Sequence, residues 1–139
     1  MKIALVTVLL AAVAGAALAS PATPMQKKPV APAIKVKNQK FCNILMTRGR
    51  QALYFWTEER DFKIHCVGEC AALWPPLIVK KASAVPKRVA GIRGTFGTIR
   101  RPDGKLQVTH DRLPVYTYAH EGPNQVLCDN VGGWFVVRL

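Results

Sequence analysis

The segments "TRGRQALYFWTEE" (residues 47–59) and "THDRLPVYTYAHE" (residues 109–121) align without a gap. We call this shift along the chain, which places Thr47 on Thr109, the repeat offset. It brings together identical or chemically similar residues at six positions, and it also places Cys66 on Cys128. The six pairs are Thr47/Thr109, Arg50/Arg112, Leu53/Val115, Tyr54/Tyr116, Trp56/Tyr118 and Glu59/Glu121. Chance gives only a few such matches, whereas seven in one register, with aromatic residues among them, indicate an internal repeat.

Each unit of the repeat has the pattern of a β hairpin. In the first unit "NILMT" (43–47) and "ALYFWT" (52–57) are the expected strands, and in the second unit "KLQVTH" (105–110) and "PVYTYA" (114–119) correspond to them. Short segments with Gly, Asp and Arg separate the two strands of each pair. The sequence therefore predicts an all-β fold, a small antiparallel β domain of two related hairpin repeats.

The segments around these hairpins also predict defined elements. "TFGTIRRPDGKLQVTH" (95–110) is typical of a further hairpin that turns at Pro102–Asp103–Gly104, and "GGWFVVRL" (132–139) of a closing strand. One short helical turn is expected near Cys70–Trp74, where the segment "GECAALW" is ended by Pro75 and Pro76. The expected boundaries are about 41–79 for repeat 1 and about 95–139 for repeat 2.

The N-terminus, "MKIALVTVLLAAVAGAALAS", predicts a secretory signal peptide over residues 1–19. The positive Lys2 precedes an apolar run that is shorter than the roughly 20 residues that span a bilayer, and "ALA" (17–19) is a cleavage signal. An uncleaved membrane anchor is the alternative. Residues 20–40, rich in Pro, Ala and Lys, are predicted to be a disordered or partly extended linker. We expect an exported bacterial monomer, periplasmic or extracellular, with no transmembrane segment in the mature chain.

Four segments resemble a known family: "ALYFWTEE", "CVGECAALWPPL", "DGKLQVTHDRLPVYTYAHE" and "GGWFVV". They are similar to the secreted repeat of unknown function, a family of bacterial envelope proteins described as predicted lipoproteins with a Tyr-x-(Phe/Trp/Tyr)-x-x-Asp motif. The most specific match is the string Cys-x-Gly-x-Cys-Ala-x-x-Trp-Pro-Pro at residues 66–76. Glu59 and Glu121 stand here in place of the motif's Asp, and no cysteine stands next to the predicted cleavage point. The resemblance implies an envelope location and a repeat architecture, but no activity.

The stretch "HCVGECAALWPP", which begins at His65, is compatible with three kinds of site. His65, Cys66 and Cys70 are ligands that suit copper or zinc, the two cysteines also suit a thiol-redox pair, and a local disulfide would staple the turn. Because the compartment is oxidising and the cysteine count is even, we predict two disulfides, Cys66–Cys70 and Cys42–Cys128, and no cofactor. The rival pairing joins Cys66 to Cys128 and Cys42 to Cys70.

Equivalent aromatic and acidic residues of the two units form a candidate ligand site. Side chains alternate along a strand, so the two aromatic residues of each unit share one face. The candidate residues are Tyr54, Trp56, Glu59, Tyr116, Tyr118 and Glu121. One interpretation is a groove for a flat ligand such as a sugar ring. The other, which the regular alternation favours, is a shared core in which each glutamate accepts hydrogen bonds in its turn.

The chain carries a formal net charge of +12, which favours anionic partners. Residues 80–105 hold eight Lys or Arg and one acidic residue. The candidate anionic-surface patch consists of Lys80, Lys81, Lys87, Arg88, Arg93, Arg100 and Arg101. Each such cation contributes on the order of 1 kcal/mol near an anionic membrane. The expected partners are anionic phospholipids or envelope polymers, whereas no nucleic-acid-binding motif accompanies the patch. A solvated charged loop is the alternative.

Catalytic signatures are sparse. The chain has three histidines, neither a G-x-S-x-G nor an H-E-x-x-H motif, and Ser83 as the only serine of the predicted domain. We therefore predict that the protein is not an enzyme. The leading hypothesis is an exported, non-catalytic cell-envelope or secreted binding module. The alternative is a periplasmic copper-like metal protein or thiol-redox protein that uses His65, Cys66 and Cys70.

Overall fold

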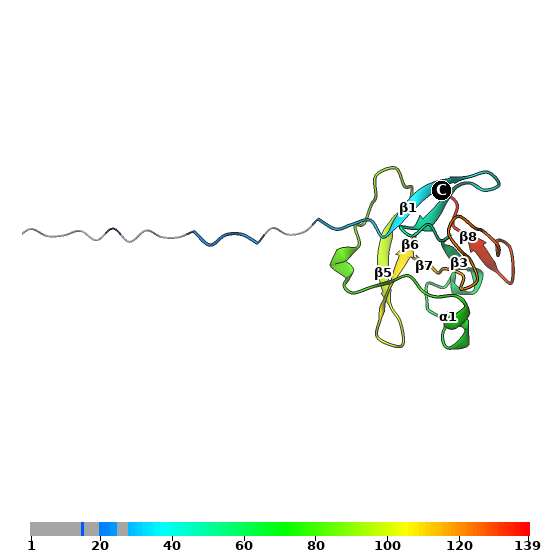
Figure 1. The fold of residues 1–139 in the computed structure, drawn as a ribbon. Helices are drawn as coiled ribbons and strands as arrows, with labels where there is room; N and C mark the ends of the chain where they lie inside the picture. Colours follow the sequence, from blue (N-terminus) through cyan, green and yellow to red (C-terminus); the bar gives the residue numbers. More distant parts are fainter. Residues whose placement is uncertain (1–14, 16–19, 25–27) are drawn as a thin grey trace, which may run out of the picture.

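A computed structural model describes residues 15, 20–24 and 28–139 of the chain. The predicted signal peptide, residues 1–19, lies outside the described residues except for Gly15. The domain consists mainly of short antiparallel strands with a short α-helix (Figure 1), which confirms the predicted all-β class. No helix in the described part of the chain is long and apolar enough to cross a bilayer.

The first two strands of the domain form a hairpin. β1 (Ala33–Asn38) pairs antiparallel with β2 (Cys42–Thr47), and the side-chain oxygen of Asn38 accepts the N–H groups of the last two turn residues. The prediction of a linker over residues 20–40 was wrong at its C-terminal end. The segment "AIKVKN" alternates apolar and polar residues, and pairing with β2 brings its apolar residues against the core.

The second unit repeats this hairpin. β5 (Phe96–Arg100) pairs with β6 (Leu106–His110) around the predicted Pro102–Asp103–Gly104 turn. β6 also pairs with β4 (Ile78–Val79) and with β7 (Leu113–Pro114). The repeat offset carries β1 onto β5, so repeat 1 begins near the start of β1 and not at residue 41.

Strand pairing between distant parts of the chain joins the two units. β3 (Tyr54–Trp56) pairs antiparallel with β8 (Trp134–Val136), the expected closing strand. Between them along the chain lie two 3₁₀ turns, η1 (Thr57–Glu59) and η2 (Ala82–Ala84). The α-helix α1 (Glu69–Leu73) coincides with the predicted helical turn.

The two units meet at equivalent residues. The backbone N–H of Tyr54 donates to the carbonyl of Tyr116 (2.8 Å), and the N–H of Tyr116 donates to the carbonyl of Tyr54 (2.9 Å). Reciprocal pairing of equivalent residues is the signature of an approximate twofold arrangement. Val136 also pairs with Tyr54, and Pro76 pairs with Tyr116. Pro76 and Val136 are therefore structural counterparts, although their separation along the chain is slightly shorter than the repeat offset.

The backbone conformation of the turns repeats as well. Residues in the left-handed region of φ occur in four pairs that are related by the repeat offset. These pairs are Cys42/Gly104, Arg50/Arg112, Phe62/Asn124 and Gly68/Asn130. The left-handed conformation costs about 1–2 kcal/mol for a residue with a side chain. Because it recurs with different residue types, the repeat preserves the geometry of its turns more strictly than their sequence.

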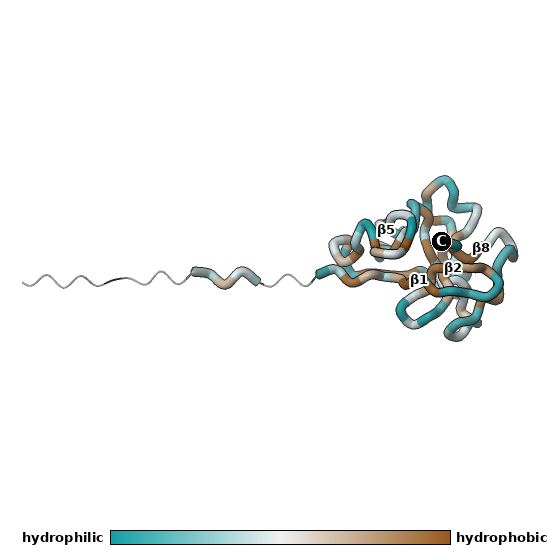
Figure 2. The backbone as a smooth tube through the Cα atoms, turned by 90° about the horizontal axis from the view of Figure 1, so that it is seen from above, coloured by the Kyte–Doolittle hydropathy of each residue, from teal (hydrophilic) through white to brown (hydrophobic). Residues whose placement is uncertain are grey.

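The core consists of two clusters on opposite faces of shared strands. Along β2, Ile44 and Met46 belong to one buried cluster, and Leu45 between them belongs to the other. Successive side chains point to opposite faces of a strand, so a strand buried on both faces supplies both clusters. Figure 2 shows β2 and β8 as hydrophobic segments in the interior of the domain, with hydrophilic loops around them. The first cluster contains Tyr54 and Tyr116 from the candidate ligand site.

Candidate functional site

The predicted tyrosines and glutamates lie in the core and form hydrogen bonds across the two units. The hydroxyl of Tyr116 donates to Oε1 of Glu59 (2.8 Å), and the hydroxyl of Tyr54 donates to Oε1 of Glu121. All four residues are buried. Burial, together with the neighbouring glutamate, raises the pKa of both tyrosines, so both hydroxyls stay protonated and act as donors. Each unit is therefore anchored to the other by a buried hydrogen bond.

Each glutamate also closes the loop that follows it. Oε1 of Glu59 accepts the backbone N–H groups of His65 (2.8 Å) and Cys66 (3.0 Å), and Oε1 of Glu121 accepts that of Leu127 (2.6 Å). His65 and Leu127 are equivalent under the repeat offset. A buried carboxylate that satisfies loop N–H groups has a structural role. Oε1 of each glutamate therefore joins the two units and closes a loop from within the core.

A stack of four aromatic rings crosses the interface between the units. Trp74 and Trp134 lie face to face at its centre, with ring centroids 3.9 Å apart. Trp56 extends the stack beyond Trp134 (5.3 Å), and Tyr118 extends it beyond Trp74 (4.8 Å). The two central rings are buried and the two outer rings are partly exposed. Because Trp56 and Tyr118 are equivalent residues, the stack follows the approximate twofold and packs the core.

The stretch that begins at His65 contains a disulfide between Cys66 and Cys70, whose Cα atoms are 5.2 Å apart. The predicted staple is confirmed, and the rival pairing of Cys66 with Cys128 is wrong. His65 is exposed and pairs with Asp61 (2.8 Å), and this hydrogen bond lowers the pKa of the Asp61 carboxyl. Within the described residues, no group of three or more histidine, cysteine or carboxylate side chains is placed to hold a metal ion.

The prediction of a second bridge, Cys42–Cys128, was wrong. Both residues are free thiols in the described structure. Cys42 is exposed at the β1–β2 turn, whereas Cys128 is half-buried beside the hydroxyl of Tyr118. Burial raises the pKa of the Cys128 thiol, although its hydrogen bond with Tyr118 opposes the rise, and a protonated thiol is a poor nucleophile. The two thiols lie in different surroundings, which an even cysteine count does not reveal.

Six of the seven predicted patch residues are exposed, but Arg101 is buried. Its guanidinium donates to Oε1 of Gln107 (2.5 Å) and to the carbonyl of Cys66 (2.8 Å). The prediction that Arg101 belongs to the patch was wrong. Successive side chains of an extended segment point to opposite faces, so Arg101, which follows the exposed Arg100 at the end of β5, points into the domain. The remaining six residues, here called the basic surface, are Lys80, Lys81, Lys87, Arg88, Arg93 and Arg100.

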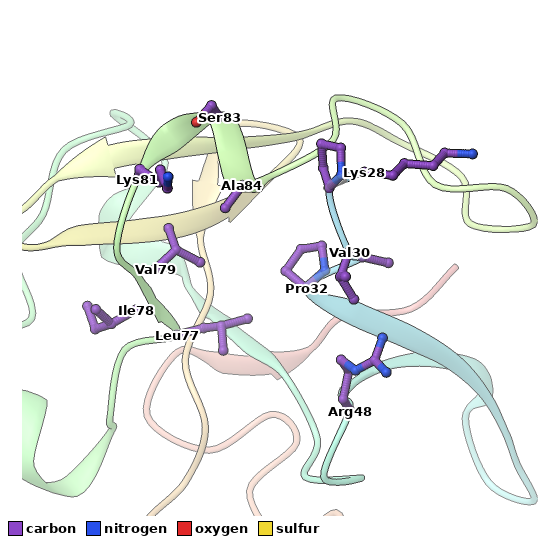
Figure 3. A pocket seen from close by; sticks show the side chains of 12 residues that line it. Lys28, Val30, Pro32, Arg48, Leu77, Ile78, Val79, Lys81, Ser83 and Ala84 are labelled. Carbon is purple, nitrogen blue, oxygen red and sulfur yellow. The ribbon is translucent and has the colours of Figure 1, made fainter. Parts of the chain in front are cut away.

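A groove of about 1010 Å³ adjoins the basic surface (Figure 3). Residues 28–32 form one wall, and β4 with η2 forms the other. Its lining is mainly apolar, with Val30, Leu77, Ile78 and Val79 among it, and includes three cations, Lys28, Arg48 and Lys81. None of the described lining residues is acidic. The sequence prediction missed this groove because its two walls come from distant parts of the chain and no local motif joins them.

The second unit offers a comparison for this groove. His110 is the counterpart of Arg48 under the repeat offset, and Val137 follows Val136 as Leu77 follows Pro76. His110 and Val137 line a hollow of only about 160 Å³, and Asp111 contributes an acidic side chain to it. The large cationic groove is therefore a feature of one unit and not a general consequence of the repeat.

No family model matches this sequence, and neither a curated protein nor a solved structure matches it. The resemblance to the secreted repeat of unknown function therefore stays a prediction drawn from the sequence segments that carry it.

Proposed function

We propose that the chain is an exported, non-catalytic binding module that attaches to anionic surfaces of the bacterial cell envelope. The observation that carries this proposal is the basic surface, six exposed cations within residues 80–100, a stretch that contains no acidic residue. Their combined field attracts polyanions such as phospholipid headgroups and envelope polymers. With each cation contributing on the order of 1 kcal/mol near a charged membrane, six cations give reversible adhesion.

Two further observations support an exported, non-catalytic module. The Cys66–Cys70 disulfide agrees with the predicted signal peptide, because disulfides persist in oxidising compartments. Its joined sulfurs carry no thiolate for a metal ion. Oε1 of Glu59 and Oε1 of Glu121 each accept a tyrosine hydroxyl and a loop N–H in the core, which gives both carboxyl groups a structural role.

Co-sedimentation with lipid vesicles tests this proposal. The chain should bind vesicles that contain phosphatidylglycerol and leave vesicles of pure phosphatidylcholine unbound. Binding should weaken steeply between 0.1 M and 1 M salt, because the Debye length falls from about 10 Å to about 3 Å. Equal binding to both kinds of vesicle, or binding that salt does not change, would contradict the proposal.

A pair of matched variants assigns the binding to the basic surface. The double variant Lys87→Ala/Arg88→Ala removes two contacts of about 1 kcal/mol each, so its affinity should fall about 30-fold. The control Arg60→Ala/Lys63→Ala removes the same charge from exposed residues elsewhere and should weaken binding less than about threefold. Equal losses in the two variants would show that net charge, and not this surface, governs attachment.

A further inference from the structure

The groove meets the basic surface at Lys81, which belongs to both. Val30 and Ile78, two apolar side chains of the groove, are 57% and 39% exposed. Figure 3 shows Val30 and Pro32 on one side of the cavity and Leu77, Ile78 and Val79 on the other. Apolar surface flanked by cations is characteristic of proteins that lie on anionic membranes.

The groove adds a hydrocarbon contact to the charge of the basic surface. A basic surface alone gives reversible membrane binding, and stable attachment combines it with a buried apolar contribution. The volume of about 1010 Å³ lies at the upper end of the roughly 300–1,000 Å³ of ordinary ligand sites, which leaves room for a long hydrocarbon chain. Arg48 and Lys81 place positive charge at the edge of this apolar space, Lys28 extends outward from its wall, and none of the described lining residues is a carboxylate.

We propose that the groove takes one acyl chain of an anionic phospholipid of the envelope membrane, and that the cations at its edge, Arg48 and Lys81 among them, attract the headgroup. This inference rests on the proposed function and names the lipid contact that strengthens it. Each methylene group that enters the groove strengthens binding about fourfold. Charge complementarity selects an anionic headgroup, and the apolar walls formed by Val30 and Leu77 select a hydrocarbon chain.

A matched pair of substitutions tests the groove without disturbing the fold. Val30→Glu places a carboxylate on the groove wall, at a residue outside every strand and helix. Val131→Glu makes the same change at a valine that is similarly exposed (52%) and lies away from the groove. On phosphatidylglycerol vesicles, Val30→Glu should bind about tenfold more weakly than Val131→Glu. On polyphosphate-coated beads, which carry charge but no hydrocarbon, the two variants should bind equally.

The outcomes separate this inference from the proposed function. If the wild-type chain binds neither vesicles nor beads, the proposed function is wrong. If the wild-type chain binds both, and the two glutamate variants are equal on vesicles, the acyl-chain inference is wrong and the proposed function stands. A loss that is equally large on beads for Val30→Glu would show a charge effect and would also overturn the inference. Val30→Ser and Val131→Ser repeat the test without added charge, with about a threefold difference expected on vesicles only.

Discussion

The two units place buried glutamates at equivalent positions, but their electrostatic surroundings differ. Glu59 accepts a hydrogen bond from the hydroxyl of Tyr116. The guanidinium of Arg101 also lies within hydrogen-bonding reach of that hydroxyl. Glu121 accepts the hydroxyl of Tyr54, and burial raises the pKa of its carboxyl against the opposing effect of its hydrogen bonds. A buried guanidinium therefore lies beside the tyrosine hydroxyl that bonds to Glu59, whereas the hydrogen bonds of Glu121 act against the cost of its desolvation.

The disulfide and the groove also differ between the units, because the first unit has both and the second unit has a free thiol and a small hollow at the equivalent places. Cys66 is bonded to Cys70, whereas the equivalent Cys128 is a thiol beside Tyr118. The groove of the first unit has a volume of about 1010 Å³. The hollow of the second unit, which is lined by the equivalent residues His110 and Val137, has a volume of about 160 Å³. The two units share the tyrosine–glutamate hydrogen bonds and the stacked aromatic rings that join them in the core. The units therefore have these hydrogen bonds and a packed core in common, whereas their other side chains differ.

The largest expected effect tests whether the two units contribute equally to the core. Trp74→Ala and Trp134→Ala should each lower the free energy of unfolding by about 3–5 kcal/mol, because each removes a buried ring from the stack. Lys87→Ala, on the basic surface, should change it by less than about 0.5 kcal/mol. Denaturant unfolding measures all three variants. An unchanged stability for either tryptophan variant would place that ring outside the core and break the equivalence of the units.

The buried cation of the first unit has the next largest expected effect. Arg101→Met leaves the side chain of Gln107 and the carbonyl of Cys66 without their donor, which should cost about 3 kcal/mol of unfolding free energy. The matched variant Arg100→Met changes an exposed neighbour and should cost less than about 0.5 kcal/mol. Thermal unfolding compares the two. A more stable Arg101→Met protein would mean that burying the guanidinium costs more than its hydrogen bonds contribute.

The disulfide is a smaller difference between the units. Replacing Cys66 and Cys70 together by Ser should lower the free energy of unfolding by about 2 kcal/mol, the loop-entropy value for so short a loop. Cys128→Ser, in the second unit, should cost less than about 1 kcal/mol. Thiol titration of the unreduced, unfolded protein should detect two thiols, from Cys42 and Cys128. Detection of none would reveal a second bridge and remove this asymmetry.

The smallest expected effect is the pH dependence that Glu121 contributes. Burial raises the pKa of Glu121 in the folded state above its unfolded value of about 4.3, so the folded state holds a proton that the unfolded state has already lost. Its contribution to stability is therefore present below that pH and is lost as pH rises through the raised folded pKa. Relative to wild type, Glu121→Gln should gain stability as pH rises from about 4 toward neutrality.

Unfolding measured at several pH values checks this dependence on Glu121. Glu58→Gln, which removes the same charge from an exposed residue of the first unit, corrects for the effect of net charge. A difference between Glu121→Gln and the wild-type protein that stays constant across this pH range would mean that the carboxyl of Glu121 is well solvated in the folded state.

Most of the strand pattern could be predicted from the sequence, and the exceptions have identifiable causes. β2, β3, β5 and β6 follow the alternation of apolar residues and the turn chemistry between them. β1 was missed because its Pro-rich and Lys-rich flank resembles a linker, although the repeat offset from β5 points to it. Arg101 was misplaced because composition does not distinguish it from Arg100. Only its position beyond the end of β5 turns it inward to Gln107.

The sequence by itself determined the repeat, the all-β class and the local staple, because these depend on residue spacing and on chemistry between near neighbours. Only the tertiary structure decided that the units cross, with Tyr54 on Glu121 and Tyr116 on Glu59. It also decided which cysteines stay free and where residues 28–32 meet β4 to form the groove. These contacts join residues that are far apart in the chain, and such contacts are chosen by the packing of the whole core, which no local pattern records.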